Sequence, residues 1–340
     1  MKKAKIVGNL SVVERIVLIV LPIIAVIVSM TIGRIIIPIG DVVFSAFEKF
    51  GYNYSVNPQI EVVLWTIRFP RIVLALLVGA GLSVAGCAFQ SLFSNPLATP
   101  DTLGVASGAS FGAALAILFG FNLLGIQLVA LLCGIVAVGL TYISSSGKSR
   151  NINTVVLVGI MIGSLFSALV SLVKFVADAE SQLPSITYWL MGSLDSASFE
   201  TLSFGAPFIL IGIFILYILR WRLNILMLSD DEAKSSGTNI KLLRIITIVC
   251  ATSITASCVS MCGQVGWVGL LIPHMCRMKF GNNHLSLVPA SISMGAVFMV
   301  VVDTVARSAS AAEIPVSILT AMVGAPFFIL LMRRSGGWQL

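Results

Sequence analysis

Few side chains in this 340-residue sequence could do chemistry, and their spacing matches no common catalytic or metal site. Cys258 and Cys262, two of the six cysteines, fall on one face of a helix, but no second Cys/His pair has the spacing of metal ligands. We interpret His274, one of two histidines, as a hydrogen-bonding residue at a helix end. Ser/His/Asp and HExxH arrangements and the GxxxxGK[ST] phosphate loop are missing. We therefore predict no catalytic residue, no metal site and no cofactor in this chain, and we do not expect an enzyme.

The composition indicates what kind of element must position any functional residue. The chain is 58% hydrophobic and 10% charged, and its mean hydropathy is +1.04. A soluble domain of this length needs a charged surface, whereas long uncharged runs are typical of helices surrounded by lipid. The alternating pattern of a membrane β-barrel is absent from the sequence. The sequence therefore predicts an all-α membrane protein, with a single transmembrane domain over residues 1–340.

A bilayer core of about 30 Å requires about 20 helical residues, and the uncharged runs predict about ten such spans. Their expected ranges are 13–36, 60–92, 103–120, 123–145, 153–176, 202–219, 241–262, 267–279, 285–306 and 315–332. The first run follows several lysines, as in a signal peptide. It is followed by Arg34, however, and a cleavage site of small residues is missing. We therefore expect it to be retained as the first span.

Lysine and arginine are distributed unevenly between the two sides of these spans. Most of the 21 basic residues lie on the side of the N-terminus. Because cytoplasmic loops carry the excess of Lys and Arg, both termini are predicted to be cytoplasmic. The net charge of +7 then reflects topology, and we predict no nucleic-acid partner.

Two stretches interrupt the apolar runs, at residues 94–112 and 260–281. Pro96 and Pro100 prevent a continuous helix in the first, and the apolar segment in the second is shorter than a bilayer is thick. In lipid, broken helix is tolerated only against protein or a watery cavity. Interrupted segments in both halves of a chain are typical of a transport pathway.

Charged side chains are expected near the ends of the spans and not at their centres. Lys174 and Asp303 are the deepest, and Asp303 is expected to pair with Arg307 four residues later. An ion-driven carrier usually keeps ionisable groups near the midplane, so this pattern favours an energy source outside the chain. An ion-driven secondary transporter and a structural membrane subunit remain the alternatives.

Five stretches in order resemble one family, the permease subunits of ATP-binding-cassette importers for ferric siderophores, haem and vitamin B12. They are RFPRIVLALLVGAGLSVAGCAFQSLFSNPLATPDTLGVASGASFG (68–112), WLMGSLDS (189–196), LSDDEAKSSGTN (228–239), GWVGLLIPHMCR (266–277) and DTVARSASAAEIPVSILTAMVGAPFFILLMRR (303–334). The resemblance implies a second permease subunit in a homo- or heterodimer, two cytoplasmic ATPase subunits that bind ATP and Mg, and an extracellular or periplasmic substrate-binding protein. It also implies the bacterial cytoplasmic membrane as the location.

This resemblance makes an iron-siderophore complex the expected substrate. Haem and cobalamin permeases share the same motifs, so these substrates are the alternatives. Selectivity in this family lies mainly in the binding protein.

The segment LSDDEAKSSG resembles the coupling helix that inserts into the ATPase cleft, expected here at about 227–238. Ser229 followed by Glu232 forms a capping box, which favours a helix start. A solvated connector is the alternative interpretation, and Ser229 and Ser236 stand where the family has glycine and leucine. The predicted ATPase-coupling residues are Asp231, Glu232, Ala233, Ser236 and Gly237.

The resemblance also assigns two further groups of residues. Arg68, Arg71 and Arg307 match arginines that contact acidic knobs on the binding protein, although interfacial anchoring would also explain them. Asn95 and Leu97 match a cytoplasmic gate, and Asn153 aligns with a second gate position that is usually serine or threonine.

Overall fold

The computed structural model describes residue 8 and residues 10–49, 57–145, 152–228, 230–310 and 312–334. These residues form helices joined by short connections, with no strand among them. In chain order the helices are α1 (Val12–Thr31), α2 (Ile39–Lys49), α3 (Pro58–Val62), η1 (Val63–Arg68), α4 (Phe69–Leu92), η2 (Pro100–Leu103), α5 (Val105–Leu118), α6 (Leu123–Ser144), α7 (Ile152–Val176), α8 (Gln182–Leu190), α9 (Phe199–Ile218), α10 (Arg220–Leu223), η3 (Ile225–Met227), α11 (Asp230–Ser235), α12 (Ile240–Cys262), α13 (Val268–Phe280), α14 (His284–Ala309) and α15 (Val316–Arg334). The prediction of an all-helical protein is confirmed for this part of the chain.

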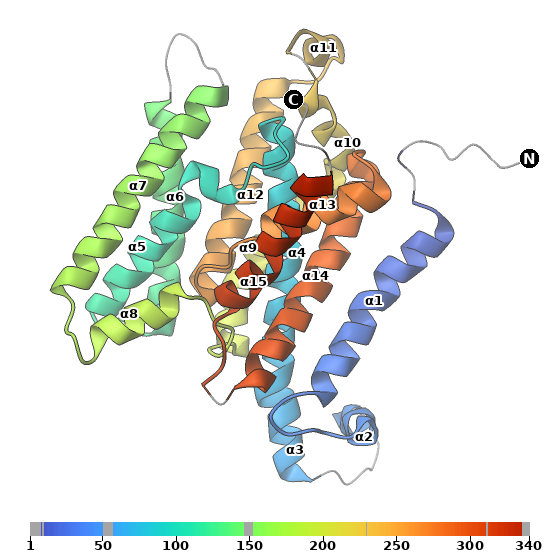
Figure 1. Ribbon diagram of the computed structural model, residues 1–340, viewed down its shortest axis with the longest axis vertical. Coiled ribbons are helices and arrows are strands. Elements are labelled where there is room, and N and C mark those ends of the chain that lie inside the picture. Colours follow the sequence, from blue (N-terminus) through green and yellow to red (C-terminus); the bar gives the residue numbers. More distant parts are fainter. Residues whose placement is uncertain are drawn as a thin grey trace, which may run out of the picture.

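Helix α4 lies at the centre of the bundle and packs against α9, α12, α13 and α14 (Figure 1). Its glycines allow this close approach. A Cβ atom on Gly79 would lie 2.1 Å from the carbonyl oxygen of Gly295, and one on Gly86 would lie 1.9 Å from that of Gly269. Without a hydrophobic driving force between helices in lipid, such small-residue contacts supply much of the attraction.

A second group of helices, α5, α6 and α7, lies to one side, with α8 across one end (Figure 1). Here too glycines set the spacing: a Cβ atom on Gly108 would lie 2.7 Å from the carbonyl oxygen of Cys133 on α6. Helix α12 packs against α5 and α6 as well as α4, so it joins the two groups.

Seven helices among the described residues are long and apolar enough to cross a membrane. They are Val12–Thr31, Pro58–Leu92, Leu123–Ser144, Thr154–Val176, Phe199–Ile218, Ile240–Cys262 and His284–Ala309. Helices also lie at the other three expected ranges. Helices α5 and α13 are too short to cross a membrane by themselves, and the apolar part of α15 is Val316–Leu330. The count of ten spans and the side of each terminus therefore stay predictions.

The structure differs from the expected spans at the first two helices. The first was expected to reach residue 36, but α1 ends at Thr31, and Ile32 after it is extended. Helix α4 is preceded by one π-helical turn, η1, in which the N–H of Phe69 bonds to the carbonyl of Leu64. Pro70 explains this turn, because a proline lacks the N–H of an α-helical bond and its ring needs room in the preceding turn.

Candidate functional site

The two interruptions predicted from the sequence lie against each other in the structure. Gln264, between α12 and α13, donates from Nε2 to Oγ of Ser110 on α5 at 2.8 Å. Gln90 on α4 donates to the carbonyl oxygen of Gly269 on α13 at 3.3 Å. The first break (residues 93–104) and the second break (residues 263–267) also line one common cavity, so they belong to one site.

A cavity of about 350 Å³ lies between the two breaks, with walls from α4, α5, α7, α12 and α13. Its polar lining residues are Thr99, Asp101, Ser107, Ser167, Thr255 and Gln264. Asp101 is the only charged one among the described residues that line it. Hydroxyl and amide groups here can bind a small polar solute. The sequence analysis predicted the breaks but did not identify these individual side chains. Polar residues within apolar helices, such as Ser167 and Thr255, were the signal that could have found them.

The backbone turns sharply where each break leads into a helix at this cavity. Gly104, just before α5, has φ of 78°, and Trp267, just before α13, has φ of 70°. The left-handed region is costly for tryptophan, and such outliers are typical of functional sites. The Trp267 ring lies against α15, where a Cβ atom on Gly324 would be 2.7 Å away, so packing fixes this conformation.

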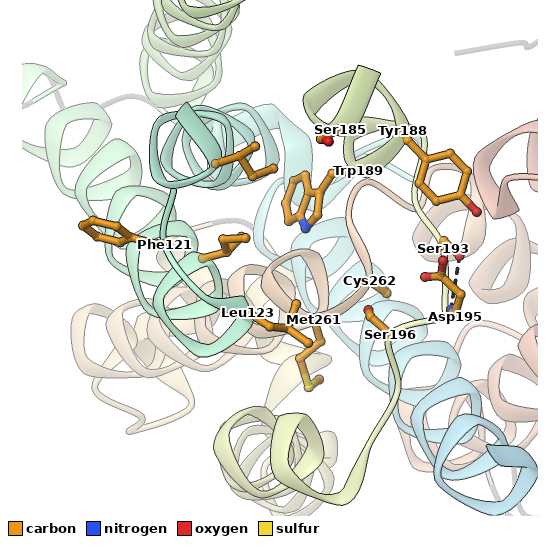
Figure 2. A pocket seen from close by; sticks show the side chains of 12 residues that line it. Phe121, Leu123, Ser185, Tyr188, Trp189, Ser193, Asp195, Ser196, Met261 and Cys262 are labelled. Carbon is orange, nitrogen blue, oxygen red and sulfur yellow. Dashed lines mark hydrogen bonds between the residues drawn. The ribbon is translucent and has the colours of Figure 1, made fainter. Parts of the chain in front are cut away.

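A second cavity, of about 400 Å³, lies where α6, α8 and α12 meet (Figure 2). Its lining residues include Phe121, Trp189, Ser193, Asp195 and Met261.

The WLMGSLDS segment, residues 189–196, forms one wall of this cavity and contacts three helices. The N–H of Ser193 donates to the carbonyl of Cys262 at 2.9 Å, and the N–H of Val316 donates to that of Gly192 at 3.0 Å. This segment therefore joins the ends of α8, α12 and α15.

An ionic cluster lies at the start of α4, near the end of α1. Arg71 donates from Nε to Oδ1 of Asp303 at 2.8 Å and from Nη1 to Oε2 of Glu313 at 2.9 Å. Nε of Arg307 lies 3.6 Å from Oδ2 of Asp303, so the predicted pairing of these two residues is confirmed. Glu313 has φ of 50° and was not anticipated from the sequence.

The three arginines predicted to dock a binding protein are buried, with exposed fractions of 4% for Arg68 and 6% each for Arg71 and Arg307. Arg68 donates to the carbonyl oxygens of Met30, Thr31 and Ile35. Arg307 donates to the carbonyl and hydroxyl oxygens of Ser29.

These contacts have a physical reason, because the last carbonyl groups of a helix have no partner within it. The arginines supply those partners at the end of α1. Their docking role stays a prediction, and in this structure they point inward. Arg34, whose side chain is 52% exposed, lies on the rim of the cluster, and its Nη2 is 3.7 Å from Oε1 of Glu313.

The predicted gate residues lie just after the C-terminal end of α4. Asn95 is exposed, Leu97 has an exposed fraction of 47%, and Oδ1 of Asn95 accepts the N–H of Leu97 at 2.9 Å. Asn153 belongs to α7, but its side chain lies outside the described residues.

A short helix, α11, lies within the range expected for the coupling helix, and its coupling role stays a prediction. Ala233 is buried, whereas Glu232, Ser236 and Gly237 are exposed, and Gly237 has φ of 69°. Ser229 and the side chain of Asp231 lie outside the described residues, so the capping box is not described.

A bundle of apolar helices in which two helix breaks line one cavity is typical of membrane transport proteins. The chain belongs to the FecCD transport family, which matches residues 20–334. The chain is 42% identical to the molybdate import system permease protein MolB of Haemophilus influenzae, over 92% of this chain and 93% of the relative. It is 36% identical to a probable iron chelatin transport system permease protein of Helicobacter pylori, over 87% of this chain and 90% of the relative.

A solved inward-facing metal-chelate type ABC transporter covers 93% of this chain at a TM-score of 0.84, with 41% identity and 97% of that chain matched. The resemblance noted in the sequence is thereby confirmed. The protein is an ABC transporter permease and a multi-pass membrane protein. Permeases of this kind are transport subunits that work with ATPase and substrate-binding partners.

Proposed function

We propose that this chain pairs with a second permease subunit and forms the translocation path of an ATP-driven importer. The observation that carries the proposal is that both helix breaks line one cavity, whose walls include hydroxyl, amide and carboxylate groups. Two ATPase subunits would bind ATP and Mg and supply the work, and an external binding protein would deliver the substrate.

In this proposal α11 is the contact with the ATPase. Its residue Glu232 and, just after it, Ser236 and Gly237 are exposed, whereas Ala233 is buried. Asn95 and Leu97 form the gate, close to the segment that precedes α11. The docking surface lies around Arg34 and the ionic cluster behind it.

We propose molybdate, a small tetrahedral oxyanion, as the first candidate substrate. The relative with 42% identity is named for molybdate import, and the cavity offers hydroxyl and amide groups of a size suited to a small solute. The helices α5 and α13 both begin at the cavity, and helix N-termini favour anions. Asp101 opposes tight anion binding, which suits a path that must release what it carries.

An iron chelate, such as the iron-siderophore complex predicted from the sequence, is the second candidate. Relatives named for iron chelatin, hemin and cobalamin transport are 36%, 33% and 35% identical to this chain. A chelate of that size would need the larger space between two permease subunits.

The deciding experiment reconstitutes the permease in proteoliposomes with its ATPase and binding protein. Uptake of radioactive molybdate and of a ferric siderophore is then compared with and without ATP. We expect ATP-dependent uptake of molybdate to exceed that of the chelate. Uptake of the chelate alone would reverse the order of the candidates, and uptake without the ATPase, driven by an ion gradient, would contradict the importer proposal.

A further inference from the structure

A buried chain of hydrogen bonds joins the turn before α11 to the end of α4. Nδ1 of His284 lies 2.9 Å from Oδ1 of Asn224, and Nε2 of His284 lies 2.5 Å from Oγ of Ser91. The backbone N–H of His284 also donates to Oδ1 of Asn224, at 3.0 Å. His284 and Ser91 both have exposed fractions of 0%. These three residues, which we call the histidine relay, connect α4, the α10–η3 turn and α14.

The partners of His284 assign its hydrogen. The amide oxygen of Asn224 can only accept, so Nδ1 of His284 donates to it. In a neutral imidazole Nε2 then accepts, and it receives the hydrogen of the Ser91 hydroxyl. That hydroxyl also lies 2.9 Å from the carbonyl oxygen of Cys87. Because the hydroxyl has a single hydrogen, Ser91 has two alternative bonding states, and only one of them includes the relay.

A second contact joins the same two regions. Residues 93–99, which we call the gate loop, follow α4 and contain the predicted gate residues Asn95 and Leu97. Oγ of Ser94 donates to the carbonyl oxygen of Leu226 in η3 at 3.4 Å, and the Leu226 side chain is 3% exposed. The turn before α11 is therefore packed against the gate loop, and it cannot shift without moving the loop or breaking these contacts.

We propose that His284 is a positioning residue that transmits movement of the coupling segment, residues 224–228 and 230–235, to the gate loop. This inference rests on the proposed function, in which α11 contacts the ATPase and Asn95 and Leu97 form the gate. Movement of α11 displaces Asn224, which turns the imidazole and releases the Ser91 hydroxyl to the carbonyl of Cys87.

Ser91 is also hydrogen-bonded to the gate loop through its main chain. The carbonyl oxygen of Ser91 accepts the N–H of Ser94 at 3.2 Å, and Ser94 has φ of 48°. A buried polar network of this kind has discrete arrangements rather than a continuous range, because each unmade bond in a water-free site is costly. It can therefore act as a two-state element between the motor side and the gate.

The test measures substrate transported per ATP hydrolysed in proteoliposomes that hold the complete transporter. The probe is radioactive molybdate, or a ferric siderophore if the wild-type complex carries that instead. Ser91→Ala removes the hydroxyl with little change in volume. His284→Asn keeps an amide near the position of Nδ1 but cannot reach Ser91. We expect each variant to lower the transport-to-hydrolysis ratio about fivefold, the lower end of typical coupling between two sites.

Ser286→Ala is the matched control. Ser286 is also a buried serine in the first turn of α14, but the single hydrogen of its hydroxyl has the carbonyl oxygens of Asn283, at 2.9 Å, and Phe280, at 3.2 Å, as acceptors, and neither belongs to the relay. We expect this variant to keep the wild-type ratio, although it loses a comparable hydrogen bond and its complex should melt at about the same temperature as that of Ser91→Ala.

Two results would overturn the inference: wild-type ratios in Ser91→Ala and His284→Asn, or an equal loss of coupling in Ser286→Ala. Failure of the proposed function would look different. In that case the wild-type permease itself would neither retain the ATPase nor transport either probe.

Discussion

At the residue scale, three buried arginines near the start of α4 show how a buried charge is stabilised in a membrane protein. Arg71 contacts both Asp303 and Glu313, and Arg68 and Arg307 donate to the main chain of α1. A buried guanidinium is costly unless it is paired and hydrogen-bonded, and these contacts meet that condition.

Arg71→Gln should therefore strongly destabilise the fold, because it leaves Asp303 and Glu313 without their shared cation. We expect the free energy of unfolding, measured in detergent mixtures, to fall by about 3–5 kcal/mol. Arg34→Gln is the control, since its side chain is 52% exposed and such pairs contribute about 1 kcal/mol or less. Equal effects of the two substitutions would contradict this interpretation of the cluster.

Docking of the binding protein is better tested at Arg34 than at the buried arginines, whose reversal would also disturb the fold. Arg34→Glu should slow association of the binding protein, because a rim charge mainly affects the rate of encounter. The effect should shrink as the salt concentration rises. Association kinetics at two salt concentrations measure it, and an unchanged rate at low salt would place the docking surface elsewhere.

At the scale of elements, glycines decide how closely the helices around α4 approach. Gly86 faces the backbone of Gly269 on α13 and Gly79 faces that of Gly295 on α14, so neither contact can be relieved by a side-chain rotation. These contacts fix α13, and with it the second break, against the cavity.

Gly86→Ala should separate α4 from α13, since the new Cβ atom would lie 1.9 Å from the carbonyl oxygen of Gly269. Overpacking of this kind costs roughly 1–3 kcal/mol. Gly139→Ala in α6 is the control, because a Cβ atom there would have nothing within 4 Å. It should be neutral or stabilising by up to about 1 kcal/mol. Thermal melting of the purified permease compares the two, and a stable Gly86→Ala variant would be inconsistent with the packing.

At the scale of the whole molecule, one chain provides half of the proposed path. The residues that line the cavity between the breaks all belong to one copy, whereas Asn95 and Leu97 are exposed and need a partner surface to close a gate. The proposed pairing of two permeases brings the two gate loops together.

Cross-linking of Asn95→Cys between two permease subunits should block transport, because the gate could no longer open. Substrate uptake with and without a thiol cross-linker measures this, and reduction of the link should restore uptake. Lys174→Cys at the end of α7, expected at the opposite end of the spans, serves as a control that should form no such link. Full transport with the Asn95→Cys link formed would exclude a gate at this position.

The sequence by itself determined the class of the protein. A long apolar chain with little charge must form helices in lipid, because every backbone group needs an internal partner there. Pro96, Pro100 and the short segment after Cys262 marked where those helices break. The order of the motifs gave the family.

Only the tertiary structure decided which parts lie together. The two breaks are far apart in the chain, yet residues of both line one cavity, and Gln264 of the second break donates to Ser110 on α5, the helix that follows the first. The docking arginines were expected at the surface and are buried, and His284, Asn224 and Ser91 meet in one contact that no local pattern indicates. The physical reason is that lipid and protein interior are about equally apolar. The length of the apolar runs therefore predicts helices in a membrane, but it does not tell which face of each helix contacts which neighbour.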